Sequence, residues 1–363
     1  MEYAAMEQYW IWLSSVEGIG VKRFYHLLSL YEDARTVWDN VGPEMAFLGE
    51  KALTNLKTAR TERYLYKLFM DLEKKGIRAV TRLSSEYPSR LTTVFDPPPT
   101  LYVRGVSDLN AERAIGVVGS RHCSRDGKRA ATEISSALSS KGVAIVSGMA
   151  RGIDTAAHQG ALAGAGRTIA VLGCGVDVVY PPENGPLAEK ILETGGSIVS
   201  EYVPGTRPLA QHFPARNRII SALADGLLLV EAAKGSGAML TVDFALEQGR
   251  DVFAVPGSIY SPLSAEPNRL IAEGAAPALG PWEILEHFRW AERPTTGAIS
   301  KREIALDTDE AALVEGLRIE EMSFDELAAR TGFHTAKLNS LLTMLELRGI
   351  IKQAPGRIYR AET

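Results

Sequence analysis

Short apolar runs alternate with helix-like stretches through the middle of the chain. The runs are rich in Val, Ile and Leu, as expected for parallel strands that are covered on both faces. The predicted strands span residues 114–118, 143–147, 168–172, 197–200, 226–231 and 251–256. The predicted helices span residues 128–139, 153–163, 186–194, 217–224 and 239–248. This alternation predicts a doubly wound, Rossmann-like α/β core, whose ligands bind beyond the carboxyl ends of its strands.

The region before this core has helical periodicity. Apolar residues recur at helical spacing, for example at Phe24, Leu27 and Tyr31, which predicts a small helical domain of helix-hairpin-helix or SAM-like type. Two glycines in the segment 16–21 permit a tight turn between helices. That turn is either purely structural or places helix-start N–H groups against a DNA phosphate, and the residues leave both interpretations open. The prolines at 97–99 then predict an extended connector.

The region after the core predicts a second small domain. Residues 294–297 are typical of a linker. Ser323 is a capping residue at the start of a helix, a second helix is predicted over residues 335–348, and two short strands follow around residues 355–356. Helix, turn, helix and hairpin describe a winged helix. This domain either packs against a protein or binds DNA, although Lys337 is one of few cations on its second helix.

These patterns divide the chain into four parts. We predict an N-terminal helical domain with its connector, a Rossmann-like core, a linker and a winged-helix domain, over residues 1–105, 106–290, 291–305 and 306–363.

The composition is that of an ordinary globular protein. Of the 363 residues, 45% are hydrophobic and 23% are charged, which excludes a disordered or low-complexity chain. The 40 Lys and Arg against 44 Asp and Glu give a formal charge of −4, so any phosphate-binding site must be local. No apolar run reaches the roughly 18 to 20 residues of a membrane span, and Glu2 and Glu7 stand where a signal peptide would be basic. We expect a soluble cytoplasmic protein with no membrane partner.

Neither a disulfide framework nor a bound metal or cofactor is predicted. Cys123 and Cys174 are too few for a framework and lack the paired Cys and His spacing of a zinc site, so we expect both thiols to be reduced. The chain also lacks a Gly-x-x-x-x-Gly-Lys-Ser/Thr loop and a Gly-x-Gly-x-x-Gly motif at the first helix of the core. The usual support for an ATPase or a dinucleotide-dependent dehydrogenase is therefore missing.

Small residues recur where the predicted strands end. They include Gly119, Ser120 and Arg121 after the first strand, Ser147 and Gly148 at the second, Gly173 and Gly175 after the third, and Lys234, Ser236 and Gly237 after the fifth. Glycine and serine let a ligand approach the backbone, and N–H groups at helix starts favour anions. Arg121 adds a charged fork that suits phosphate. A single such turn can have a purely steric reason, but their convergence predicts an anion-binding site.

A second group of candidate residues lies between the fourth and fifth strands. Arg216 and Arg218 bracket Asn217 at the start of a predicted helix, where they could face a phosphate backbone. The alternative is that the two arginines pair with Glu201 or Glu231. Phe213 either stacks on a base or packs against its neighbours. The residues alone leave both pairs of alternatives open.

The motifs of the core, taken in order, resemble the DprA (Smf) family of DNA-processing proteins. They are Gly119-Ser120-Arg121, Ser147-Gly148, Gly152-Ile153-Asp154 with Ala157-His158, Leu172-Gly173, Tyr180-Pro181, Ser200-Glu201, Phe213-Pro214, Arg216-Asn217-Arg218, Ser236-Gly237, Ala254-Val255-Pro256-Gly257, Asn268, Leu270-Ile271 and Gly274-Ala275. They cover about residues 85 to 280, and their combined specificity is high. The two flanking regions also look like the flanking domains of longer family members.

The resemblance implies a non-catalytic protein whose core binds single-stranded DNA without sequence preference. It also implies a homodimer through the core that helps load RecA recombinase onto DNA during natural transformation. From the sheet-end pattern and the resemblance together, the residues predicted to contact single-stranded DNA are Gly119, Ser120, Arg121, Ser147, Gly148, Phe213, Arg216, Asn217, Arg218, Lys234, Ser236 and Gly237. Ala215 and Ala210 stand where relatives often have a basic side chain, which predicts a lower affinity.

Two other classes of function remain possible from the residues. A nucleotide or nucleoside-phosphate hydrolase would draw on the acidic and imidazole groups at the same sheet edge, namely Asp154, His158, Asp177, Glu201 and Glu231. The spacing of Asp154 and His158, one helical turn, is more typical of a capping or packing pair, and no nucleophile, base and metal set is legible. The third class is a scaffold whose core binds no nucleic acid.

Overall fold

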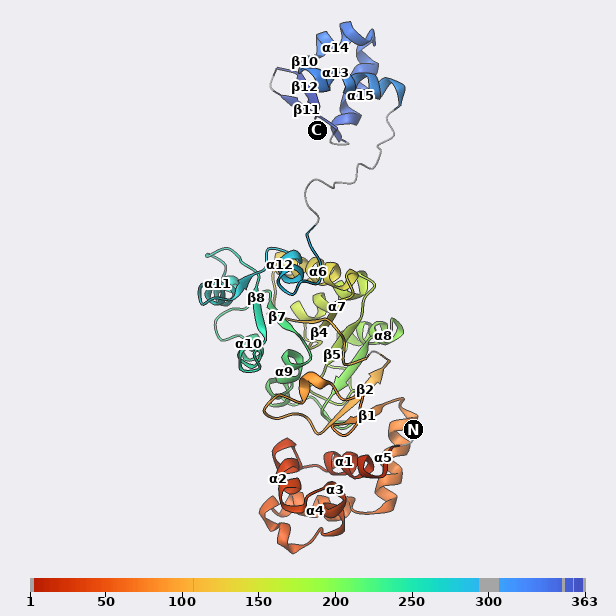
Figure 1. Cartoon of the computed structure of the whole chain (residues 1–363), viewed down its shortest axis with the longest axis vertical. Helices are drawn as coiled ribbons and strands as arrows, with labels where there is room; N and C mark the ends of the chain where they lie inside the picture. Colours follow the sequence, from red (N-terminus) through yellow and green to blue (C-terminus); the bar gives the residue numbers. More distant parts are fainter. Residues whose placement is uncertain (1–2, 107, 294–306, 348–349, 355, 362–363) are drawn as a thin grey trace. The chain divides into compact units, whose positions relative to one another are not determined.

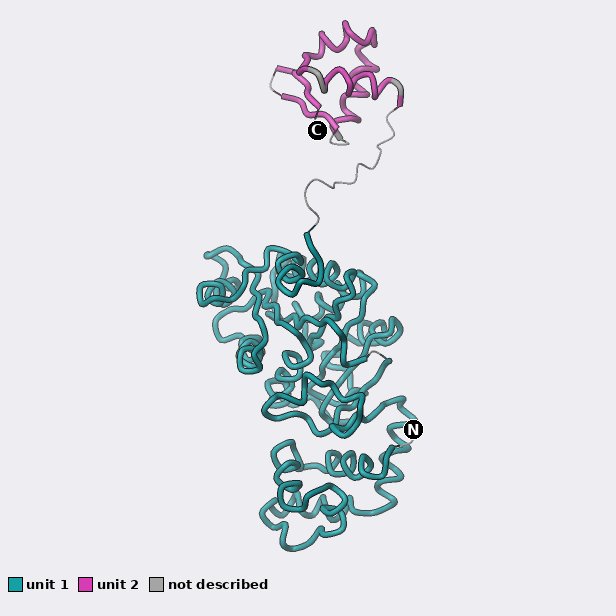
Figure 2. The backbone as a smooth tube through the Cα atoms, in the orientation of Figure 1, with its two compact units in different colours: residues 1–293 teal, residues 294–363 magenta. Residues whose placement is uncertain are grey.

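The computed structural model describes residues 3–106, 108–293, 307–347, 350–354 and 356–361. The chain forms two compact units, residues 1–293 and residues 294–363, which are considered separately (Figure 2). The predicted linker, residues 291–305, lies outside the described residues from residue 294 onward.

A nine-stranded sheet lies in the first unit (Figure 1). The order of its strands is β1-β2-β6-β5-β4-β3-β7-β8-β9. All six predicted strands are present, as β3 (Ala114–Val118), β4 (Ala144–Ser147), β5 (Thr168–Val171), β6 (Ser197–Ser200), β7 (Gly226–Leu229) and β8 (Asp251–Ala254). These six strands are parallel. The chain runs from β3 outward through β4 to β6 and then crosses back to β7, so the strand order reverses beside β3. This reversal confirms the doubly wound, Rossmann-like class.

Helices cover both faces of the sheet. Alternate side chains of each strand point to opposite faces, so β3 buries Ile115 and Val117 on one side and Ala114 and Val118 on the other. The helices of the core are α6 (Arg125–Ser140), α7 (Ile153–Ala163), α8 (Gly185–Glu193), α9 (His212–Ala222), α10 (Ala238–Glu247), α11 (Ala265–Ala272) and α12 (Trp282–His287). Apolar residues of α6, α7 and α12 pack on the first face, and those of α9, α10 and α11 pack on the second.

Three strands of the sheet were not predicted. They are β1 (Arg78–Thr81), β2 (Thr100–Gly105) and β9 (Ala276–Pro277). Strands β1 and β2 pair with each other and β2 pairs with β6, in both cases antiparallel. The prediction that residues 1–105 are a helical domain and connector is therefore wrong for residues 78–105, which belong partly to the main sheet. Strand β2 directly follows three prolines, and both strands lie outside the alternation of strands and helices on which the prediction rests.

The N-terminal region before β1 is helical, as predicted. It contains α1 (Ala5–Ser15), α2 (Val21–Tyr31), α3 (Ala34–Asp39), α4 (Glu50–Ala59) and α5 (Glu62–Lys74), with the 3-10 turn η1 (Pro43–Leu48) between α3 and α4. Trp12, Phe24 and Leu27 are fully buried among these helices. Gly18 has a φ of +95°, the left-handed region that favours glycine. The side chain of Arg23 donates a hydrogen bond to the carbonyl of Gly18, so the turn is closed by the protein itself.

The second unit has the predicted winged-helix order. Its elements are α13 (Thr308–Ile319), β10 (Met322–Ser323), α14 (Phe324–Thr331), α15 (Thr335–Leu347), β11 (Ile351–Ala354) and β12 (Ile358–Ala361), and its antiparallel sheet has the order β10-β12-β11. Ser323 caps α14 by accepting a hydrogen bond from the Glu326 amide. Lys337 on α15 pairs with Asp309 at 2.5 Å, so its charge is already partly neutralised.

Three features of the described residues bear on broader classes of function. No helix among them is long and apolar enough to cross a membrane. No group of three or more His, Cys, Asp or Glu among them is arranged to hold a metal ion. Cys123 and Cys174 are both free thiols, and burial raises the pKa of Cys174 to about 11.

Candidate functional site

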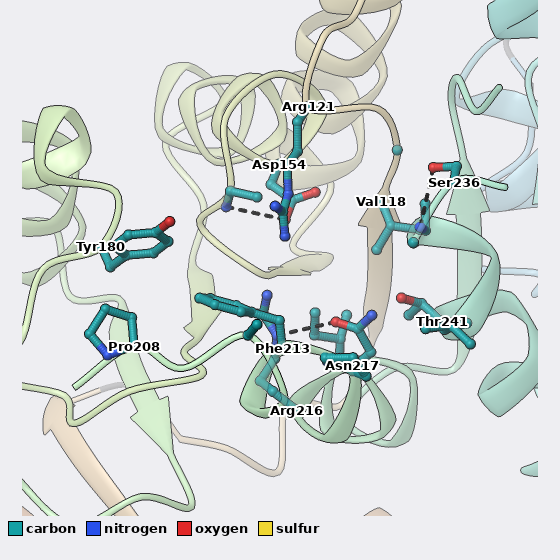
Figure 3. Close-up of a pocket in the computed structure, with 18 residues that line it drawn as sticks. Val118, Arg121, Asp154, Tyr180, Pro208, Phe213, Arg216, Asn217, Ser236 and Thr241 are labelled. Atoms are coloured by element: carbon teal, nitrogen blue, oxygen red, sulfur yellow. Dashed lines mark hydrogen bonds between the residues drawn. The ribbon is translucent and has the colours of Figure 1, made fainter. Parts of the chain in front are cut away.

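A cavity of about 550 Å³ lies at the carboxyl end of β3, where the strand order reverses (Figure 3). Tyr180 and Pro208 stand on one side of it, and Ser236 and Thr241 stand on the other. Its position is the one at which doubly wound sheets bind ligands. Seven of the twelve predicted contact residues line it, namely Gly119, Arg121, Phe213, Arg216, Asn217, Ser236 and Gly237.

Helix α9 presents three of these residues together. The helix begins at His212, five residues before the predicted start at 217. Phe213, Arg216 and Asn217 therefore occupy positions i, i+3 and i+4 of one helix, and such residues share a face. The predicted start at residue 217 left Phe213 and Arg216 outside the helix, so their common face was not predicted.

Arg216 is a buried cation rather than an open anion ligand. Its side chain is only 3% exposed. The guanidinium donates hydrogen bonds to the carbonyl of Gly148, at 2.7 Å, and to the carbonyl of Val171. Burial lowers the pKa of Arg216 to about 10, and burial raises the pKa of the nearby Asp154 carboxyl against the opposing charge of Arg216. Arg216 thus ties α9 to the ends of β4 and β5.

Two glycines at the site are required by close packing. A Cβ atom at Gly148 would lie 2.6 Å from the Arg216 guanidinium. A Cβ atom at Gly119 would lie 2.7 Å from the side chain of Ile153 and 2.9 Å from the carbonyl oxygen of Glu231. All three distances are too short for ordinary contact, so both positions require glycine for packing reasons that are independent of any ligand. Gly148 lines a small adjoining cavity rather than the main one.

Arg121 is the exposed cation of the cavity. Among the residues that the structure describes, no acceptor makes a hydrogen bond or ion pair with its guanidinium, which lies 5.7 Å from the centroid of the Phe213 ring. The Phe213 ring is in turn 5.4 Å from the ring of Tyr180. A cation and two aromatic rings therefore meet at one site. Tyr180 belongs to a family motif but is not among the predicted contact residues, although its position in the loop after the third predicted strand points to the same sheet edge.

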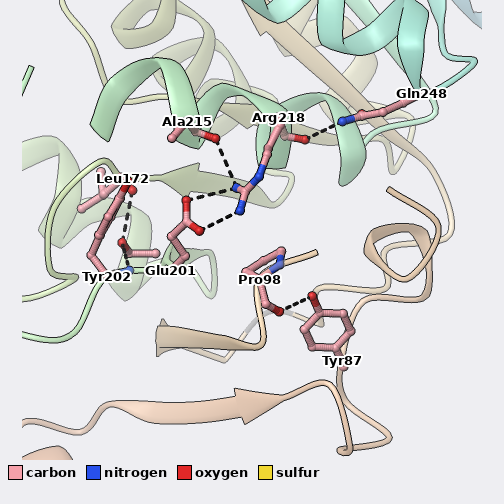
Figure 4. Close-up of polar contacts among 9 residues, drawn as sticks. Tyr87, Pro98, Leu172, Glu201, Tyr202, Ala215, Arg218 and Gln248 are labelled. Atoms are coloured by element: carbon pink, nitrogen blue, oxygen red, sulfur yellow. Dashed lines mark hydrogen bonds and ion pairs between the residues drawn. The ribbon is translucent and has the colours of Figure 1, made fainter. Parts of the chain in front are cut away.

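Arg218 faces away from the cavity. It makes a two-pronged ion pair with Glu201, with N–O distances of 2.7 and 3.1 Å (Figure 4). The two side chains are only 11% and 8% exposed. Of the two alternatives left open by the sequence, a phosphate contact or an ion pair with a glutamate, Arg218 therefore makes the ion pair. Arg218 follows Phe213 by five residues and so lies on another face of α9. This explains why Phe213 lines the cavity and Arg218 does not.

The other predicted contact residues have different surroundings. Ser147 is fully buried and its hydroxyl donates to the carbonyl of Val117 at 2.6 Å. Ser120 accepts a hydrogen bond from the His122 amide in the loop after β3. Lys234 is exposed, with no hydrogen bond or ion pair to another described residue. Ser147, Ser120, Lys234 and Arg218 do not line the main cavity.

The groups considered for hydrolysis are occupied within the protein. His158 is fully buried, its Nδ1 lies 2.7 Å from the Thr168 hydroxyl, and burial lowers its pKa to about 3. Asp177 pairs with Lys75. Glu231 accepts hydrogen bonds from the backbone and hydroxyl of Ser124. Of the five acidic and imidazole groups, only Asp154 lines the cavity, so the described residues there show no nucleophile and base pair.

The first unit is therefore a Rossmann-like α/β protein with a cavity at its topological switch point, lined by an exposed arginine, aromatic rings and helix starts. The second unit is a winged helix. Comparison with known families agrees with both. The model of DNA recombination-mediator protein A matches residues 78–289, and the model of the DprA winged helix domain matches residues 300–357. The chain belongs to the DprA (Smf) family.

Individual relatives are similar over much of their length. Protein Smf of Escherichia coli (strain K12) is 39% identical over 296 residues, which cover 80% of this chain and 79% of that protein. The X-ray structure of DNA processing protein A from Streptococcus pneumoniae has a TM-score of 0.65 at 35% identity, over 79% of this chain and 98% of that one. The protein from Helicobacter pylori, whose structure was described for its single-stranded DNA binding mode, has a TM-score of 0.53 at 26% identity, over 59% and 95% of the two chains.

Proposed function

We propose that this protein binds single-stranded DNA without sequence preference across the carboxyl edge of its main sheet. The observation that carries the proposal is the exposed guanidinium of Arg121, which has no ion pair with a described residue, lies beside the Phe213 ring and lines the switch-point cavity. A cation attracts the phosphate backbone and an aromatic ring stacks on any base, so neither contact depends on sequence. The single-stranded DNA binding reported for the Helicobacter pylori relative supports the same function.

The predicted contact residues fall into two groups in this proposal. Direct contacts come from groups that are at least partly exposed and make no ion pair with a described residue, namely Gly119, Ser120, Arg121, Phe213, Asn217, Lys234, Ser236 and Gly237. The backbone N–H groups at the start of α10, next to Ser236 and Gly237, favour a phosphate. The supporting group holds the cavity in shape and consists of Ser147, Gly148, Arg216 and Arg218. The proposed function has no chemical step.

The family membership supports a wider role. We propose that the bound strand is passed to RecA recombinase in the cytoplasm during natural transformation, and that the protein acts as a homodimer. For the dimer contact, the core offers the exposed apolar side chains of Ile259, Tyr260 and Leu279 near the sheet edge at β9, with exposed fractions of 81%, 89% and 77%. Light scattering on the wild type and on Tyr260→Asp tests the dimer, which the variant should weaken.

The strand-binding proposal is tested by fluorescence anisotropy of a labelled oligothymidylate. The wild type and Arg121→Ala are titrated at several salt concentrations. We expect Arg121→Ala to weaken binding by about tenfold or more, because a charge-assisted hydrogen bond is lost. The dependence of log affinity on log salt should also become shallower, by about 0.7 for a lost phosphate contact on a single strand.

A matched control removes a charge at the opposite end of the strands. Arg167 is exposed, immediately precedes β5, and makes no side-chain hydrogen bond or ion pair with the rest of the described chain. Arg167→Ala therefore changes the net charge equally but should leave both affinity and salt slope near the wild-type values. Failure of the wild type to bind at low salt would overturn the proposal, and equal losses in both variants would reduce it to a bulk charge effect.

A further inference from the structure

We propose that the strand-binding surface continues beyond the cavity, with Tyr180 as a second base-stacking residue and Arg207 as a further phosphate contact. This inference rests on the proposed function and specifies its ligand. It identifies a linear polyanion that crosses the sheet edge, rather than one nucleotide enclosed in the cavity.

Tyr180 has the position and the exposure of a stacking residue. It lines the main cavity and also the small adjoining cavity that contains Gly148. Its side chain is 39% exposed, and its ring plane is tilted by 38° from that of Phe213. Because the two rings do not lie parallel, they do not fully cover each other. A strand that stacks one base on Phe213 therefore meets a second aromatic surface next to it.

Arg207 combines an anchored backbone with an uncommitted charge. It directly precedes Pro208, which stands beside Tyr180 at the cavity (Figure 3). The carbonyl of Thr206 accepts a hydrogen bond from the Gly175 amide, and the Gly205 amide donates to Asp177 at 2.6 Å. The Arg207 side chain is exposed and has no hydrogen bond or ion pair with a described residue. Its loop is thus fixed while its guanidinium is available.

Other cations near Tyr180 are less available. Arg151 also lines the small cavity, but it pairs with Glu183. Arg216 is buried, as described above. Of these three described arginines, Arg207 is therefore the one available to extend the site on the Tyr180 side.

The distribution of the available cations favours an extended ligand. Lys234, Arg121 and Arg207 lie on the loops that follow β7, β3 and β6, respectively. Strands β3 and β6 are separated by β4 and β5 in the sheet, which places their ends about 14 Å apart at the usual strand spacing. A single phosphate group cannot reach all three loops. A polynucleotide with a charge on every residue can contact each of them in turn.

The experiment compares a long oligothymidylate with a dinucleotide, using the anisotropy assay for the first and competition for the second. Arg207→Gln should weaken binding of the long strand by about 3- to 10-fold at low salt and make the salt slope shallower by about 0.7. Its effect on the dinucleotide, which occupies only the cavity, should be within about twofold. Arg167→Gln is the matched control and should change neither value.

The stacking residue gives a different signature in the same assay. Tyr180→Ala should weaken binding of the long strand by about 5- to 150-fold, the range for loss of one stacked base, while the salt slope stays unchanged. Tyr180→Phe should bind like the wild type. Tyr180→Leu keeps most of the apolar volume but has no ring, so its binding should be as weak as that of the alanine variant. It serves as the test variant if Tyr180→Ala disturbs folding.

The outcomes separate this inference from the function on which it rests. If the wild type binds no single-stranded DNA, the proposed function itself fails. If Arg121→Ala loses affinity while Arg207→Gln and Tyr180→Leu bind the long strand like the wild type, the extension is wrong and the proposed function stands. An equal loss for the dinucleotide and the long strand in Arg207→Gln would place Arg207 inside the cavity site and overturn the extended path.

Discussion

Arg121, Arg207 and Lys234 differ from Arg216 and Arg218 in their surroundings rather than in their charge. The first three are exposed, on loops after strands, and make no ion pair with described residues. Arg216 and Arg218 lie on α9, where Arg216 is buried and the Arg218 side chain is only 11% exposed, and both are satisfied by backbone carbonyls or by a glutamate. One sheet edge therefore carries cations that are available to a polyanion and cations that hold the protein together.

The comparison shows why a basic motif alone does not locate a phosphate contact. A buried arginine needs hydrogen-bond acceptors within the protein. If its side chain moved toward a ligand, those acceptors would lose their hydrogen bonds. An exposed arginine loses little when a phosphate replaces water. We therefore expect substitutions in the buried set to change stability first, and substitutions in the exposed set to change affinity without changing stability.

The largest expected effect comes from the Arg218 and Glu201 pair. Arg218→Met leaves the Glu201 carboxylate buried without its partner, which should lower the free energy of unfolding by about 3 to 5 kcal/mol. Urea denaturation of the first unit, followed by tryptophan fluorescence, measures this change. Arg121→Met should leave the same transition within about 0.5 kcal/mol of the wild type.

A double variant sharpens this test. Arg218→Met combined with Glu201→Leu removes both charges, and replacing a buried pair with apolar groups is often close to neutral. The double variant should therefore be more stable than either single variant. If Arg218→Met costs no more than Arg121→Met, the division into buried and exposed cations is wrong.

A methyl group at Gly148 should separate Arg216 from its acceptors. The added Cβ would lie 2.6 Å from a guanidinium that is buried and hydrogen-bonded, so Gly148→Ala should destabilise the first unit by about 3 kcal/mol. Gly237→Ala is the matched control, because its Cβ meets no atom within 4 Å and its φ is −62°. The control should unfold like the wild type, although a methyl group at the cavity can still weaken strand binding. Equal stability of the two variants would contradict a structural role for Arg216.

Burial also predicts a pH dependence of stability, through His158. Its pKa is about 3 in the folded chain, because burial disfavours the charged ring, against 6.5 for the exposed residue. Below pH 6.5 the unfolded chain binds a proton that the folded chain does not, so stability falls as the pH falls toward about 3. Between about pH 7 and about pH 5 this one group should remove about 2 kcal/mol. His158→Gln should lose correspondingly less over that interval in the same denaturation assay, and an unchanged pH dependence would contradict the assignment.

Much of the fold was predictable because the core strands are continuous apolar runs. The six parallel strands and the site at their carboxyl ends followed from that pattern. Strands β1 and β2 did not, since they lie outside the alternation of strands and helices, and β2 joins the sheet by antiparallel pairing with the distant strand β6. The direction of Arg218 could not be predicted either, because it depends on where α9 begins. Because the helix begins at His212 rather than at residue 217, Phe213 and Arg216 lie on one face of it and Arg218 lies on another.

The smallest expected effect tests whether strand binding through Arg207 depends on the contacts that anchor its loop. Lys75, at the end of α5, pairs with Asp177, and Asp177 also accepts the Gly205 amide hydrogen bond two residues before Arg207. Lys75→Met should cost about 0.5 kcal/mol of stability, as a partly exposed ion pair does. It should weaken strand binding by about twofold with no change in salt slope, since no phosphate contact is removed. Lys74→Met removes the same charge from a side chain that has no hydrogen bond or ion pair among the described residues, and it should bind like the wild type. If both lysine variants lose affinity equally, and both with a shallower salt slope, the lysines act as bulk charge and the loop that carries Arg207 is independent of the N-terminal helices.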